Sequence, residues 1–137
     1  MTKSTPYPPP FTEAQLEIIN VVWERGEATI SEIWETLRQH RKIARATVQT
    51  VVQRLEGKGW LRHRPIGKTF MFSVVFSKED VQGHLVNNLV DKAFGGSVEG
   101  LVWSLLKNRE VSSAEAKRIQ TMIDQAKKKR GKGRKKS

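Results

Sequence analysis

The spacing of apolar residues between positions 12 and 76 restricts the fold more than any other feature of this sequence. Three successive segments repeat apolar side chains at the three- and four-residue intervals of an amphipathic helix, and two short strand-like runs follow them. The first two helical segments each begin with a capping box, Thr12 to Gln15 and Thr29 to Glu32. We therefore expect two short helices with well-defined starts.

The third segment is ambiguous by composition, because residues 47–52 are rich in β-branched side chains that favour strands. Its periodicity favours a helix that ends at Gly57 or Gly59, since a two-residue period would not separate its apolar and polar residues into two faces. One face would hold Val48, Val51, Val52 and Leu55, and the other Thr47, Thr50 and Arg54.

Residues 60–64 and 69–74 read as two strands joined by the turn-forming stretch Pro65-Ile66-Gly67-Lys68. A β-hairpin is predicted. Three helices closed by a hairpin are the order of a winged helix-turn-helix, so residues 12–76 are expected to form that domain. The fold class is then mainly α with a small β-hairpin wing, followed by a helical region.

Residues 77–126 return to helical periodicity, in three short amphipathic segments. Isolated helices of such length are marginal in water, so we expect them to pack against a second copy of the chain. Packing on the winged helix of the same chain is the alternative. Residues 1–11 are expected to be flexible, and residues 127–137, which lack apolar side chains, to be disordered. The residues proposed for dimerisation are Val81, Leu85, Leu89, Leu101, Leu105, Ile119 and Ile123.

The net charge of +11 is concentrated in two stretches. Residues 127–137 hold eight Lys and Arg and no acid, and residues 41–68 hold eight against the single Glu56. Such clustering is the footprint of a protein that binds nucleic acid, and double-stranded DNA is the expected partner. Threonine and arginine on the third helix could reach base edges, and cations on the hairpin could reach phosphates. The residues proposed from this reasoning are Arg45, Thr47, Thr50, Arg54, Arg62, Arg64 and Lys68.

Other classes of function are disfavoured by the sequence. The chain has no cysteine, which excludes disulfides and thiolate metal sites, and its histidines (His40, His63 and His84) lack metal-ligand spacing. We expect no enzyme activity, no cofactor and no bound metal. No apolar run is long enough to span a membrane, and the polar, proline-rich start does not resemble a signal peptide, so membrane insertion is not expected and a cytoplasmic location is.

Four parts of the sequence carry a resemblance to a known family: the helix from Leu16 to Trp23, the stretch Thr47-Val48-Gln49-Thr50 with Arg54-Leu55 and Gly59, the wing residues Gly67 to Phe70, and the stretch Val111 to Glu115. Together they resemble the penicillinase-repressor (BlaI/MecI/CopY) family, and the resemblance extends from Thr12 to about Ala126. The resemblance implies a homodimeric repressor whose winged helix binds an inverted-repeat operator and whose C-terminal half forms the dimer. Thr47, Thr50 and Arg54 match positions of the family's recognition helix. Ala46, beside Arg45, stands where the family has a basic residue, and Lys68 matches a basic position of the wing.

The inducing signal stays open. The copper-responsive branch of the family carries paired cysteines, which are absent here. The β-lactam-responsive branch is cleaved at an Asn-Phe bond in a pathway with a membrane sensor-protease, and the corresponding bond here is Ser104-Leu105. Two other interpretations also stay open: a non-specific or architectural nucleic-acid-binding protein driven by the basic tail, and a winged helix that binds an acidic protein.

Overall fold

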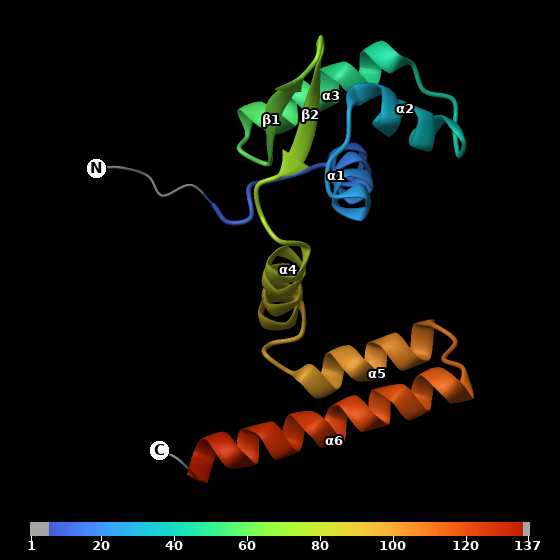
Figure 1. Ribbon diagram of the computed structural model, residues 1–137. Helices are drawn as coiled ribbons and strands as arrows, with labels where there is room; N and C mark the ends of the chain where they lie inside the picture. The colour runs from blue at the N-terminus through green and yellow to red at the C-terminus, as the bar shows by residue number, and fades with distance from the viewer. Residues whose placement is uncertain (1–5, 136–137) are drawn as a thin grey trace. The chain divides into compact units, whose positions relative to one another are not determined.

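The computed structural model describes residues 6–135, with side chains as far as Lys129. The chain divides into two compact units, one ending at Asn88 and one beginning at Leu89 (Figure 1). The mainly α fold with one hairpin is confirmed. The elements are α1 (Glu13–Arg25), α2 (Ile30–Arg38), α3 (Arg45–Gly57), β1 (Leu61–Ile66), β2 (Thr69–Val74), α4 (Lys78–Ala93), α5 (Val98–Asn108) and α6 (Ser113–Lys135).

Both predicted capping boxes are present. The Thr12 hydroxyl accepts from the Gln15 backbone N–H at 3.1 Å, and the Gln15 side chain accepts from the Thr12 N–H at 3.0 Å. Thr29 and Glu32 form the same reciprocal pair at 3.1 and 2.9 Å. Each box satisfies two backbone donors that a helix start would otherwise leave without partners, so α1 and α2 begin where the sequence predicts.

The third segment is a helix, as its periodicity predicts. Val48, Val52 and Leu55 are fully buried on one side of α3 and belong to the core of the first unit. Burial of this apolar face outweighs the weaker helix propensity of the β-branched residues, which amounts to only tenths of a kcal/mol each.

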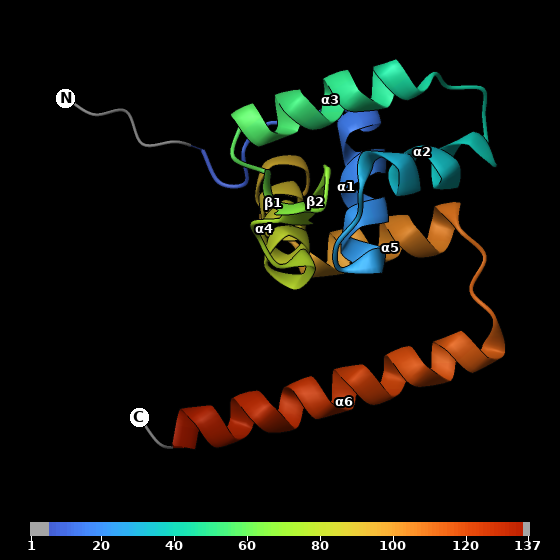
Figure 2. The same ribbon diagram turned by 45° about the horizontal axis from the view of Figure 1, so that its top comes forward.

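The hairpin pairs β1 with β2 in antiparallel register, from Leu61 opposite Val74 to Ile66 opposite Thr69. Gly67, at φ +59°, supplies the left-handed residue of the turn. Leu61 and Phe72 point into the core, and Phe72 also exchanges backbone hydrogen bonds with Ala28. Both views show the hairpin beside α3 (Figures 1 and 2).

Three tryptophans tie segments of the first unit together through their indole N–H groups. Trp23 donates to the Phe76 carbonyl at 3.0 Å, Trp34 to the Ile43 carbonyl at 2.9 Å, and Trp60 to the Pro9 carbonyl at 3.1 Å. The Trp34 bond spans the turn between α2 and α3. Each ring also packs on the core, so one side chain both fills space and fixes a connecting segment.

The N-terminal arm differs from expectation. Residues 1–11 were expected to be flexible; residues 1–5 lie outside the described part, but the residues that follow pack on the first unit. Pro9 is buried against Trp60, and the Lys58 ammonium donates to the Pro10 carbonyl at 3.2 Å. The Tyr7 ring meets Phe76 edge-on at 5.0 Å. Proline-rich composition suggests an extended segment, but it does not reveal the aromatic surface that holds it.

The boundaries of the helical region also differ. Val81 is fully buried in the core of the first unit and Leu85 packs against that core, so the winged-helix unit includes the first part of α4. At the other end, α6 continues to Lys135, where a disordered tail was expected from Lys127. Lysine and arginine are good helix formers, so a helix that begins at the Ser112 cap can continue through residues 127–130 without apolar side chains.

Candidate nucleic-acid interface

The side of α3 opposite its buried face is exposed and carries Ala46, Thr47, Thr50 and Arg54. The Thr50 hydroxyl donates to the Ala46 carbonyl at 3.1 Å, which leaves its methyl group and both oxygen lone pairs for an external partner. Arg54 forms no ion pair with any residue between positions 6 and 129. The same exposed face of α3 therefore carries the Thr50 methyl group and hydroxyl acceptor together with the Arg54 guanidinium. Such groups can contact base edges or phosphates.

Gln53 is a further candidate that the sequence analysis did not include. It is exposed and follows Thr50 by three residues, so it lies on the same helical face. A glutamine amide can bond to both N6 and N7 of adenine in the major groove. The three-residue spacing from Thr50 is the sequence signal that identifies it.

Arg45 lies at the first position of α3, where its guanidinium donates to the Ser31 hydroxyl at 3.1 Å. Serine is neutral, so the bond orients the arginine at the start of the helix and leaves its charge uncompensated. Arg41, just before it, is different. It forms an ion pair with Glu17 at 2.7 Å, and this contact raises the pKa of the arginine.

The hairpin presents Arg62 and Arg64 on the same face, because they alternate with His63 along β1. Arg64 pairs with Glu27, at 2.8 and 3.0 Å, and its hydrogen bond lowers the pKa of that carboxyl. Arg62 and the turn residue Lys68 are exposed and have no acidic partner in the described part of the chain. Of the three predicted wing cations, two are available and one is compensated within the chain.

The residues proposed for dimerisation separate into two groups. Val81 and Leu85 belong to the first unit, as described above, and Val81 has no surface left for a partner. In the second unit Leu101 is half-buried, while Leu89, Leu105, Ile119 and Ile123 are exposed. Exposed apolar side chains that the prediction did not include accompany them: Val98, Val102, Trp103, Leu106 and Met122.

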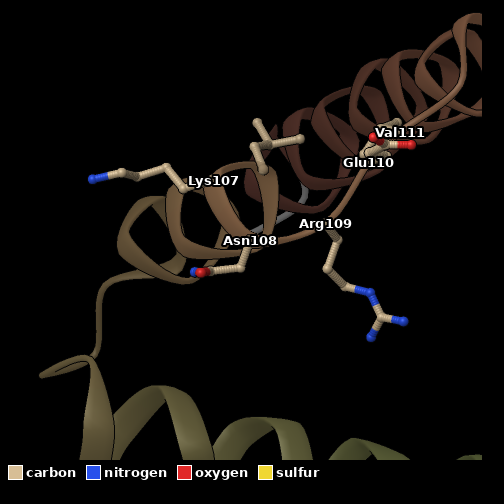
Figure 3. Close-up of a pocket in the computed structure, with 6 residues that line it drawn as sticks. Lys107, Asn108, Arg109, Glu110 and Val111 are labelled. Atoms are coloured by element: carbon tan, nitrogen blue, oxygen red, sulfur yellow. The ribbon is translucent and has the colours of Figure 1, made fainter.

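Between α5 and α6 lies an apolar groove of about 450 Å³, lined by Val102, Leu105, Ile119 and Ile123 among others. A second, polar hollow lies at the turn that joins the two helices, and its lining includes Lys107, Asn108 and Arg109. Figure 3 shows Arg109 pointing away from Lys107 and Asn108. Because these polar groups do not converge, the hollow is a poor site for a small ligand. Ser104 and Leu105 both lie within regular α5.

Neither a metal-binding cluster nor a membrane-spanning helix is present in the described part of the chain. No three histidine, aspartate or glutamate side chains come close enough to hold a metal ion there. No helix in the same range is long and apolar enough to cross a membrane.

Comparisons with known proteins agree with this geometry. The family model described as penicillinase repressor matches residues 11–125. The methicillin resistance regulatory protein MecI of Mammaliicoccus sciuri is 21% identical over 114 residues, covering 83% of this chain and 93% of the relative. The penicillinase repressor of Bacillus licheniformis is 23% identical over 119 residues, covering 87% and 93%.

Among solved structures, the DNA-binding domain of the repressor BlaI is 26% identical and covers 58% of this chain and 93% of that domain, with a TM-score of 0.49. An Escherichia coli MarR mutant crystallised with operator DNA is 16% identical and covers 85% and 75%, with a TM-score of 0.50, which supports the fold alone. The family model spans most of the chain, from the N-terminal cap of α1 into α6. The chain belongs to the penicillinase repressor family.

Proposed function

We propose that this protein is a transcriptional repressor that binds a specific DNA operator through α3 and its wing. The observation that carries the proposal is the exposed face of α3, where Thr50, Gln53 and Arg54 project from a helix whose other side is locked in the core. An α-helix fits the major groove, where each base pair presents a distinct pattern of donors and acceptors. Arg62 and Lys68 would contact phosphates beside it and set the register.

The repressor would act as a homodimer on an inverted repeat. The exposed apolar residues of α5 and α6, and the groove between these helices, need a covering surface, and a second copy offers the same apolar residues. Two recognition helices held about one DNA turn apart, roughly 34–36 Å, would match two half-sites. The dimer then gains affinity from both contacts at once.

The first experiment is a genomic footprint followed by binding measurements on the sites it finds. Discrete inverted repeats are expected, whereas continuous, smeared coverage would instead favour a non-specific architectural protein. On an identified operator, Thr50→Ala and Arg54→Ala should each weaken binding by about 1–3 kcal/mol and reduce the preference over random DNA. Lys92→Ala, which removes an exposed cation from α4, is the control and should keep the preference. Wild-type preference in both α3 variants would refute the assigned recognition helix.

The dimer surface is tested by sedimentation. Leu105→Asp places a carboxylate in the apolar surface of α5 and should yield monomers, because burial of an unpaired charge is strongly unfavourable. Asn108→Asp places the same group at an exposed polar position of the same helix and should leave the dimer intact. If Leu105→Asp remains a folded dimer, the α5 surface is not the interface.

A membrane sensor-protease, which the family resemblance implies, would be a further partner. Cleavage at Ser104-Leu105 would require α5 to unwind locally, because a protease binds its substrate in an extended form and this bond lies inside a helix. A gene for a membrane metalloprotease beside the gene for this protein would support that route.

A further inference from the structure

We propose that the basic end of α6, residues 127–135, is a second DNA contact that binds the phosphate backbone without reading bases. The inference rests on the proposed function, since it assumes that the protein is held on duplex DNA. Residues 127–137 contain eight of the chain's 25 lysines and arginines and no acid. The family model ends at residue 125, so this segment lies outside the part of the chain that the family model matches.

The structure continues α6 as one helix through this segment to Lys135. Ile123 is the last large apolar residue of the helix, and the following twelve residues extend about 18 Å beyond it at 1.5 Å per residue. The basic segment therefore lies beyond the apolar surface proposed for the dimer on α6. A partner copy seated on Ile119 and Ile123 would not need to cover it.

Lys127, Lys128 and Lys129 are exposed and form no ion pair with any side chain that the structure describes. Consecutive cations repel one another, and this repulsion opposes helix formation, although the negative end of the helix dipole offsets part of it. A polyanion that neutralises several of them at once would remove the repulsion. Duplex DNA carries one negative charge per about 1.7 Å of its axis, which is dense enough to meet successive lysines.

The composition of the segment favours DNA over other anionic partners. From Lys127 to the end of the sequence there is no apolar side chain, so the segment has no face to insert into a membrane or a protein groove. Its attraction is electrostatic only. Once α3 is bound to an operator, the nearest polyanion is the same DNA, at a high effective concentration.

The test uses the full chain with Lys127, Lys128 and Lys129 changed together to Gln, and a control in which the same three become Arg. Binding to an operator and to a random duplex is measured by fluorescence anisotropy between low and moderate salt. Each phosphate contact contributes about 0.9 to the slope of log affinity against log salt, so the Gln variant should lose up to about 2.7 per chain. Its affinity for both duplexes should fall by the same factor, and the Arg variant should keep the wild-type slope.

An unchanged slope in the Gln variant would overturn the proposal. So would a fall confined to the operator, because a contact that reads no bases must act on both duplexes. Vesicles containing phosphatidylserine test the other anionic surface: binding to them that is tighter than to the random duplex at equal salt would also overturn it. Failure of the proposed function looks different, since wild type would then show no preference for any operator while the slope difference between the Gln and Arg variants would persist.

Discussion

Replacement of Trp60 by Phe should destabilise the winged helix far more than the same replacement at Trp34. Trp60 is completely buried, and its indole N–H is bonded to the buried Pro9 carbonyl at 3.1 Å. Phe keeps one aromatic ring but leaves that carbonyl without a donor, at a cost of about 1–3 kcal/mol. The lost pyrrole portion leaves a cavity of roughly 40 Å³, which at about 24 cal/mol per Å³ adds about 1 kcal/mol. The sum is about 2–4 kcal/mol.

Trp34 makes an equivalent bond to the Ile43 carbonyl at 2.9 Å, but its ring is only half-buried. Water can reach the carbonyl when the indole is removed, so Trp34→Phe should cost only the net value of one hydrogen bond, about 0.5–1.5 kcal/mol. Trp103 is 62% exposed in α5, and Trp103→Phe is the control with an expected change within about 0.5 kcal/mol.

The assay is urea unfolding followed by far-UV circular dichroism, with all variants at one protein concentration because dimer formation adds to the apparent stability. Fluorescence would be unsuitable, since each variant loses a tryptophan. Equal costs at Trp60 and Trp34 would refute the reasoning. That result would mean that the Pro9 carbonyl is solvated and that the N-terminal arm does not seal the aromatic core.

Three further predictions concern hydrogen-bonded groups outside the core. Thr29→Ala should lower the stability by about 1 kcal/mol in urea unfolding, because it removes the side-chain acceptor at the start of α2. The pKa of Glu32 is lowered, chiefly by the hydrogen bond that its carboxylate accepts from the Thr29 backbone N–H, so the ionised carboxylate stabilises the fold at pH values above its ordinary pKa of about 4.3. The difference in stability between wild type and Glu32→Gln should therefore be constant near neutral pH and shrink as the pH falls from about 5 to 3. Glu27→Gln removes the ion-pair partner of Arg64, so DNA affinity should rise at low salt. The slope of log affinity against log salt should steepen by up to about 0.9 per chain. An unchanged slope would show that Arg64 does not reach DNA.

The order of elements could be predicted because local signals in this sequence agree with one another. The capping boxes at Thr12 and Thr29 fix two helix starts by short-range hydrogen bonds, which depend only on residues three positions apart. The hairpin follows from two strand-like runs around Gly67. In α3, periodicity decided correctly against β-branched composition, because the helical face could be buried and a strand face could not.

Most predictions that the structure corrects concern the surface that a side chain contacts. Hydrophobic periodicity does not encode that surface. The apolar stripe of α4 that contains Val81 could face a core or a dimer interface equally well. Only the tertiary structure shows that Val81 lies in the core of the first unit. Arg64 counts as a basic residue in the sequence, but Glu27, 37 positions away, compensates it. The N-terminal arm is bound by Trp60, more than 50 positions away. Such long-range pairings leave no local trace.

The position of the α3 face that is proposed to contact DNA therefore depends on residues outside that face. α3 is held by its buried valines, by the Trp34 bond across the preceding turn, and by Trp60, which follows its C-terminal end and packs against Phe11, Trp23 and Phe76. A recognition helix needs this support, because a shift of about 1 Å lengthens a hydrogen bond to a base beyond the range in which it discriminates. Trp60 follows the end of α3, and the indoles of Trp34 and Trp23 bond to carbonyls just before α3 and just before α4, where such a shift would begin. If α3 is the recognition helix, as proposed, their hydrogen bonds to the backbone would contribute to specificity through geometry as well as to stability.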